Sequence, residues 1–282
     1  MNHDSDGGYL PQAAGHRLYW RRFQATHPRA QLLLVHGIGE HSGRYEDIIS
    51  HFLRMGLNVF AYDQYGHGRS EGRRGDLDTP QRLVEDLRSM RQELRRLAPD
   101  LPLILFGHSM GGAVVADYLV QYQGGEEAPD YAVLSSPALK THMTVLSKLG
   151  SRALQALAPH LVITHHLSMK VSHRDEVNAQ LKNDPLCHKK ISGSLSGFIL
   201  AAGEAARAHA QDWQVPTLLL YAGADFLVDA KGSTEFARKS PPLVQAHCFE
   251  GYYHEIFHEI NPEPVYARLA VWLDDMVGKA EK

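Results

Sequence analysis

Cysteine is scarce in this chain, whose 282 residues contain only Cys187 and Cys248. Two cysteines cannot form the disulfide network that stabilises small secreted domains, so the composition indicates a reducing, cytoplasmic compartment. The first eight residues are polar, without the basic start and apolar stretch of a secretory signal. The sequence also lacks a run of about 18 apolar residues, the length that a membrane-spanning helix needs.

An excess of charge of one sign is also lacking. Lys and Arg together number 29 and Asp and Glu 32, which gives a formal net charge of −3. This balance offers no electrostatic reason to expect nucleic acid as a partner. What the chain does have is an apolar content of 44%, which is enough for a sizeable core.

Short apolar runs alternate with helical patterns along most of the chain. Helical spacing occurs at residues 43–55, 83–97, 112–122 and 262–277. The runs that predict strands are residues 18–23, 31–35, 57–62, 103–106, 131–135, 216–221 and 243–249. The alternation predicts an α/β fold with a mostly parallel sheet and helices on both faces, preceded by a loose leader at residues 1–15.

Residues 137–210 interrupt this rhythm, because no run there predicts a strand. An apolar stripe at helical spacing comprises Leu146, Leu149, Ala153, Leu154 and Leu157. We therefore expect a helical cap at 137–210, inserted into a core domain formed by residues 1–136 and 211–282. Most of the stripe should pack on the core domain, with a minority exposed at the mouth of a site.

The pentapeptide of residues 107–111, GHSMG, lies between a predicted strand and a predicted helix. A G-x-S-x-G sequence at such a turn is the nucleophile elbow of serine hydrolases. Gly107 and Gly111 would allow the tight turn, which raises the serine above the edge of the sheet. The motif makes Ser109 the candidate nucleophile.

A serine nucleophile needs a base and a group that orients the base. Asp225 and His254 each follow a predicted strand, as Ser109 does, so all three can meet at one edge of the sheet. Asp229 competes with Asp225 and His258 with His254. We favour Asp225 and His254, and expect Asp229 to be a turn residue and His258 a solvated histidine.

The oxyanion of the tetrahedral intermediate needs two N–H donors. The amide that follows the nucleophile, Met110 N–H, is one candidate. The second should come from the loop after the strand at 31–35, and Ile38 N–H is our candidate there because glycines flank it.

The block of residues 36–45, HGIGEHSGRY, resembles the signature of the monoacylglycerol lipases and the related bacterial lysophospholipases. The resemblance extends over residues 16–275. It implies an α/β-hydrolase fold, no cofactor, and cleavage of monoacylglycerol to glycerol and fatty acid through an acyl-enzyme. It implies the triad Ser109, Asp225 and His254, an oxyanion hole of the Ile38 and Met110 amides, and substrate contacts of Glu40 and Arg44 with the glycerol group.

This sequence departs from the family pattern at two places. His173 is inserted in the cap, and Phe257 stands where the mammalian enzymes have a second histidine. The cap histidines His165, His166, His173 and His188 match no zinc pattern, so we expect surface histidines and no metal.

The expected partner is a small lipid ester, with weak peripheral membrane contact through the cap. A lysophospholipase or a broad-specificity carboxylesterase would use the same triad, and a peptidase or an acyltransferase of this fold is a further alternative. The non-enzymatic alternative is a silent hydrolase-fold protein that binds lipid.

Overall fold

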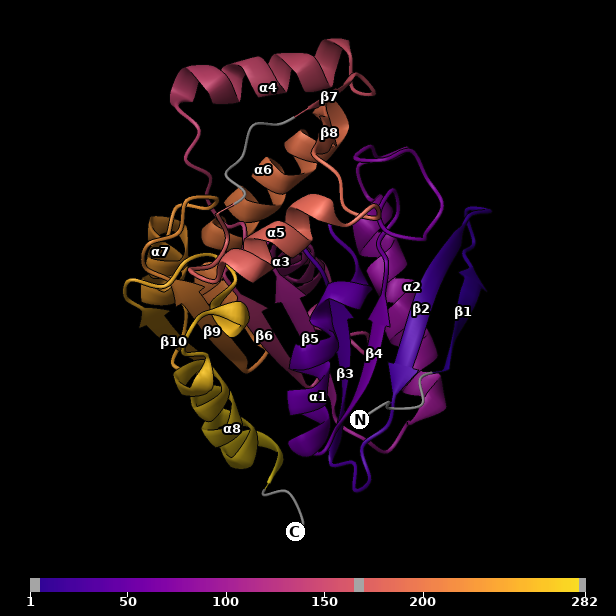
Figure 1. Cartoon of the computed structure of the whole chain (residues 1–282), viewed down its shortest axis with the longest axis vertical. Coiled ribbons are helices and arrows are strands. Elements are labelled where there is room, and N and C mark those ends of the chain that lie inside the picture. Colours follow the sequence, from indigo (N-terminus) through magenta and orange to yellow (C-terminus); the bar gives the residue numbers. More distant parts are fainter. Residues whose placement is uncertain (1–5, 165–169, 279–282) are drawn as a thin grey trace.

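The computed structural model describes residues 6–164 and 170–278. Eight strands form one sheet in the order β1-β2-β4-β3-β5-β6-β9-β10 (Figure 1). β2 runs antiparallel to both of its neighbours, and every pair from β4 to β10 is parallel. The strands of this sheet are β1 (Asp6–Pro11), β2 (Arg17–Phe23), β3 (Ala30–Val35), β4 (Leu57–Tyr62), β5 (Leu103–His108), β6 (Tyr131–Ser135), β9 (Thr217–Ala222) and β10 (Val244–Phe249).

Helices cover both faces of the sheet, as the sequence predicts. One core contains side chains of α1 (Glu46–Arg54) and α8 (Glu263–Val277). The other contains side chains of α2 (Arg82–Leu97), α3 (Met110–Tyr122), α6 (Gly193–Ala208) and α7 (Lys231–Lys239). Successive residues of β3 alternate between these cores, because neighbouring side chains of a strand point to opposite faces. Three short 3-10 helices are η1 (Ser42–Tyr45), η2 (Ala210–Asp212) and η3 (Ile256–His258).

The expectation of a loose leader at residues 1–15 is wrong for residues 6–11, because β1 pairs with β2 along its whole length; residues 1–5 lie outside the described residues. Its sequence, DGGYLP, contains two glycines and a proline, which lower the intrinsic preference for a strand. A strand at the edge of a sheet tolerates these residues, and the neighbouring strand supplies the hydrogen bonds.

The segment between β6 and β9, which we call the cap segment (residues 137–210), is mostly helical. It contains α4 (Val145–Leu157), α5 (Asp175–Asn183) and α6. The expectation that it holds no strand is wrong, because β7 (Val162–Thr164) and β8 (Lys190–Ser192) form a small antiparallel pair. In Figure 1, α4 lies at the top of the molecule, above α6 and far from the sheet.

The parallel strands place the candidate residues at one edge of the sheet. Ser109 directly follows β5, Asp225 follows β9, and His254 follows β10. Ile38 lies in the loop after β3. The chain also enters the cap segment from the same end of β6, so the cap segment lies over the site.

Candidate active site

Ser109 occupies the sharp turn between β5 and α3. Its backbone has φ 54° and ψ −119°, a conformation that costs a residue with a side chain about 1–3 kcal/mol. A Cβ on Gly111 would lie 2.1 Å from the Val35 carbonyl oxygen, and one on Gly107 would lie 2.5 Å from the Gly111 carbonyl oxygen. Only glycine fits at both positions, so the turn has the tight geometry that the motif predicts.

Asp225 and His254 form a buried hydrogen-bonded pair. His254 Nδ1 donates to Asp225 Oδ2 over 2.6 Å. The other carboxylate oxygen, Oδ1, accepts the Leu227 and Val228 amides at 2.8 and 3.1 Å. These two amides fix the orientation of the carboxylate, which in turn fixes the His254 ring with its proton on Nδ1.

Each member of the pair shifts the pKa of the other towards the charged form. Burial alone would raise the pKa of the Asp225 carboxyl, but the His254 ring and the two backbone amides outweigh it and lower the pKa. Burial would lower the pKa of His254, but the Asp225 carboxylate outweighs it and raises the pKa above 6.5. A base of this kind can accept a proton at neutral pH and stay stabilised once it is charged.

The free nitrogen of His254 is directed away from the carboxylate. Nε2 is buried and has no hydrogen-bond partner among the described residues. The His254 ring lies 4.8 Å, centroid to centroid, from the ring of His108, the residue before Ser109. Burial, together with His254 nearby, lowers the pKa of His108 to about 4, so His108 is neutral at pH 7.

Ser109 opens into a cavity of about 550 Å³ beneath the cap segment. The described residues that line it include no Asp, Glu, Lys or Arg. Apolar side chains dominate its wall: Ile38, Met110, Ala138, Met143, Leu154, Ile163, Ile191, Ile199, Leu200, Phe226, Leu227 and Val228. A cavity of this size and lining suits an apolar chain whose polar end reaches Ser109.

Ile38 and Met110 both line this cavity together with Ser109. Met110 is the first residue of α3, where helical N–H groups have no partner inside the helix and the helix dipole favours negative charge. Neither the Ile38 nor the Met110 N–H has an acceptor within the described part of the chain. The two amides therefore remain available to a developing oxyanion.

Glu40 and Arg44, which we expected at the glycerol end of the pocket, do not line this cavity. Glu40 Oε1 accepts Gly37 N–H and the Tyr45 hydroxyl, both at 2.6 Å. Arg44 Nη1 donates to Glu40 Oε2 at 2.5 Å. Both side chains are used in hydrogen bonds within the chain. Through its bond from Gly37 N–H, Glu40 holds the loop that carries Ile38.

The sequence analysis missed the extension of this network to the loop of His254. Arg44 also forms a two-pronged pair with Glu255 at 2.9 and 3.1 Å, and Glu255 accepts His258 Nδ1 at 2.7 Å. Burial would raise the pKa of Glu255, but Arg44 outweighs it and lowers the pKa. The only local sign in the sequence that Glu255 belongs to the site is its position directly after His254.

The two rivals of the candidate residues have other partners. Asp229 pairs with Lys140 at 2.9 Å and accepts the Lys231 amide at 3.0 Å, as a turn residue does. His258 differs from our expectation of a solvated histidine. Its side chain is mostly buried against Glu255 because η3 turns it inward.

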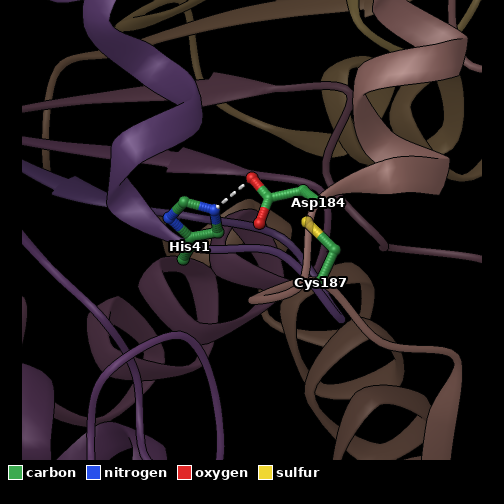
Figure 2. A group of neighbouring side chains, drawn as sticks. All are labelled: His41, Asp184 and Cys187. Atoms are coloured by element: carbon green, nitrogen blue, oxygen red, sulfur yellow. Dashed lines mark hydrogen bonds and ion pairs between the residues drawn. The ribbon is translucent and has the colours of Figure 1, made fainter.

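Figure 2 shows the one cluster with metal-ligand chemistry that occurs among the described residues, formed by His41, Asp184 and Cys187. His41 Nδ1 accepts Gly43 N–H at 3.1 Å, so the ring proton sits on Nε2 and is donated to Asp184 at 2.9 Å. Burial raises the pKa of the Cys187 thiol to about 12. A ring whose two nitrogens are both used in hydrogen bonds has no free lone pair to offer a metal.

The cap histidines have separate partners. His173 Nδ1 pairs with Glu259 at 2.9 Å, and His188 Nε2 lies 3.2 Å from the Gly66 carbonyl oxygen. His165 and His166 lie outside the described residues.

The apolar stripe of α4 is more exposed than we expected. Leu146 is 79% and Leu157 86% exposed, and Leu149 is also exposed. α4 crosses over α6 as a roof, so only its inner side, with Leu154, reaches the cavity. The expectation that most of the stripe packs on the core domain is therefore wrong. No helix within the described ranges is long and apolar enough to cross a membrane.

Comparison with known proteins identifies a matching family and several similar lipases. The family described as "Serine aminopeptidase, S33" matches residues 26–261. A monoacylglycerol lipase of Mycolicibacterium smegmatis is 33% identical over 252 residues, which cover 88% of this chain and 89% of the relative. The human monoglyceride lipase is 30% identical over 284 residues, 96% of this chain and 91% of that protein. The crystal structure of a Paleococcus ferrophilus monoacylglycerol lipase superposes with a TM-score of 0.83 at 31% identity, covering 92% of this chain and 99% of that one.

Proposed function

Since the chain belongs to the α/β-hydrolase family described as "Serine aminopeptidase, S33", we propose that it cleaves monoacylglycerols to glycerol and a free fatty acid. The observation that carries the proposal is the apolar cavity of about 550 Å³ that ends at Ser109. The relatives named monoacylglycerol lipase support the same substrate class.

Ser109, His254 and Asp225 perform the reaction in two steps. Ser109 Oγ attacks the ester carbonyl carbon while its proton moves to His254 Nε2, and the Ile38 and Met110 amides hold the oxyanion. The bond to the glycerol oxygen then breaks, and His254 returns the proton to that oxygen. A water molecule next attacks the acyl group on Ser109, again giving its proton to His254. The fatty acid leaves as Ser109 regains its proton.

The cavity wall argues against the alternatives within the fold. An aminopeptidase needs acidic groups that bind the amino terminus of a peptide, and a lysophospholipase would gain from basic groups near the phosphate. No Asp, Glu, Lys or Arg occurs among the described lining residues, and the one histidine there, His142, lies with Nε2 3.0 Å from the Asp225 carbonyl oxygen. A neutral glyceryl ester is the substrate that such a wall fits without leaving a charge unpaired.

The test compares monoacylglycerols of several chain lengths with lysophosphatidylcholine, p-nitrophenyl esters and an aminoacyl amide. We expect the highest kcat/KM with monoacylglycerol and none with the amide. A fluorophosphonate probe should label the wild type, whereas Ser109→Ala should show neither label nor turnover at an unchanged Tm. Retained turnover in Ser109→Ala would identify a different nucleophile, and absence of label in the wild type would favour the lipid-binding alternative.

Substrate enters from a lipid surface through weak contact of α4. The inner side of α4 faces the cavity, and its outer side carries exposed leucines, including Leu146 and Leu157. Replacing both leucines by serine should reduce flotation with phosphatidylcholine vesicles and turnover of monoacylglycerol in them, while hydrolysis of a dissolved short ester is unchanged. Equal flotation of both proteins would contradict this contact.

A further inference from the structure

The cap segment contacts both loops of the candidate active site from the two ends of one helix, α5. Residues 170–174 precede α5 and contact the His254 loop (residues 250–259). Residues 184–188 follow α5 and contact the Ile38 loop (residues 36–41). Figure 1 shows α5 over the upper ends of the strands and below α4.

At the N-terminal end of α5, backbone and hydroxyl groups make the contact. Glu255 N–H donates to the Val171 carbonyl oxygen at 2.8 Å. Ser172 Oγ donates to the His258 carbonyl oxygen, also at 2.8 Å. Val171 and Ser172 are both buried, so water cannot easily replace these bonds. The two bonds lie on the C-terminal side of His254.

His173 adds a contact on the other side of His254. Its Nδ1 lies 2.9 Å from Glu259 Oε1, and its ring stacks on Tyr253 with 3.6 Å between centroids. Glu259 Oε1 also accepts Tyr253 N–H at 2.8 Å. Because Tyr253 directly precedes His254, residues 171–173 contact the chain on both sides of His254.

At the C-terminal end of α5, the contact is with the oxyanion side. Asp184 Oδ2 accepts His41 Nε2–H at 2.9 Å (Figure 2). His188 N–H donates to the Gly39 carbonyl oxygen at 2.8 Å. A Cβ on Gly39, whose φ is +71°, would lie 2.2 Å from the His188 carbonyl oxygen, so the two backbones touch. Gly39 directly follows Ile38.

The stretch before α5 is bonded to the helix by Asn178, and the stretch after it by Asp184 N–H, which donates to the Gln180 carbonyl oxygen at 3.0 Å. The side chain of Asn178 accepts Val171 N–H and donates to the Ser172 carbonyl oxygen, each at 2.9 Å. Asp184 Oδ1 accepts Leu186 N–H at 2.8 Å, which fixes the turn after the helix. The nine residues of α5 span about 13 Å at the usual rise of a helix. The two contacts are therefore the ends of one stiff element.

We propose that residues 170–188, which we call the α5 brace, hold the His254 loop and the Ile38 loop at a fixed separation. Ser172 and Asp184 act as positioning residues at its two ends. The separation matters because the base and the oxyanion donor must reach the same carbonyl group, and a misplacement of 1 Å can cost about 10²-fold in rate. The inference rests on the proposed function, since that assigns these roles to His254 and Ile38.

A double-mutant cycle with p-nitrophenyl butyrate tests the brace. Ser172→Ala removes the hydroxyl bond to the His258 carbonyl oxygen at one end, and Asp184→Ala removes the bond to His41 at the other. Each single variant should lower kcat about tenfold with little change in KM, and the double variant should fall no further, because a brace loosened at one end no longer fixes the separation. Asp184→Asn can keep the bond from Leu186 N–H, but its NH₂ group then faces His41 Nε2–H, so it should lower kcat as Asp184→Ala does. Lys182→Ala, on the exposed side of α5, is the matched control and should equal the wild type.

A fall of about 100-fold in the double variant would mean two independent local effects and would overturn the brace, as would single variants with wild-type kcat. Amide hydrogen exchange gives a readout that does not depend on turnover. In Asp184→Ala, exchange should become faster in the remote His254 loop as well as in the Ile38 loop. Faster exchange confined to the Ile38 loop would overturn the brace. If the wild type neither hydrolyses the ester nor reacts with fluorophosphonate, the proposed function fails and the exchange result still decides on the brace.

Discussion

Replacing Asp225 by asparagine is expected to reverse the tautomer of His254. Oδ1 of residue 225 accepts two backbone amides, so the asparagine oxygen must stay on that side and its NH₂ group must face His254 Nδ1. Nδ1 then has to accept a hydrogen bond, which moves the ring proton to Nε2. A ring protonated at Nε2 cannot take the proton of Ser109.

The size of the effect follows from these contacts. To restore the active tautomer, the asparagine would have to turn over and place its NH₂ group against the two backbone N–H donors. This turn costs about 1.5 kcal/mol for each hydrogen bond that is lost. Loss of the carboxylate opposite the charged imidazole adds about 2 kcal/mol, the value of a hydrogen bond to a charged group. The sum of about 5 kcal/mol corresponds to a fall in kcat/KM of about 10³–10⁴-fold.

The assay is hydrolysis of p-nitrophenyl butyrate, with Asp225→Ala as the matched variant. Alanine removes the acceptor but imposes no tautomer, so we expect it to retain more activity than asparagine. The Tm of both proteins reports whether they remain folded. If Asp225→Asn keeps more than a tenth of the wild-type kcat/KM, or loses less than Asp225→Ala, then residue 225 does not orient His254.

Three further results are expected. Asp225 raises the pKa of His254, and only the neutral ring acts as a base, so kcat/KM should rise with pH through a pKa above 6.5. In Asp225→Ala this rising part of the pH profile should move to lower pH. The same profile in both proteins would contradict the prediction. Gly111→Ala places a Cβ 2.1 Å from a carbonyl oxygen and should lower the free energy of unfolding by about 3 kcal/mol in urea titrations, whereas a loss under 1 kcal/mol would mean that the turn can relax. Arg44→Ala leaves the buried carboxylates of Glu40 and Glu255 without their cation and should cost about 3 kcal/mol in the same titration; an unchanged midpoint would show that the network contributes nothing.

The sequence predicts the sheet and the elbow well because their signals are local. A buried parallel strand is a short apolar run, and the turn at Ser109 needs glycines at fixed offsets. β1 escaped prediction because its composition opposes a strand and only its pairing with β2 makes it one. Local composition carries no information about such a partner.

The side-chain contacts that hold the loops of the candidate site could not be predicted, for a related reason. Arg44 is 211 residues from Glu255, and His41 is 143 residues from Asp184. No periodicity or spacing links residues so far apart, because the fold alone brings them together. The exposure of α4 was also missed, since an apolar stripe has the same pattern whether a protein core or a lipid surface covers it.

The place where the chain leaves and rejoins the sheet has a consequence for how this protein could diversify. β6 and β9 are parallel neighbours, paired from Ala132↔Thr217 to Ser135↔Leu220, so the chain leaves at the carboxyl end of β6 and must cross to the amino end of β9. α4 and α5 come before α6, the last α-helix ahead of β9, in a long loop that starts at the carboxyl end of β6. Lengthening such a loop costs little chain entropy, about 0.6 kcal/mol for each doubling. We expect that chimeras can exchange the roof helix α4 for another and acquire new acyl preferences, whereas a graft that discards α5 would fold with a lowered turnover.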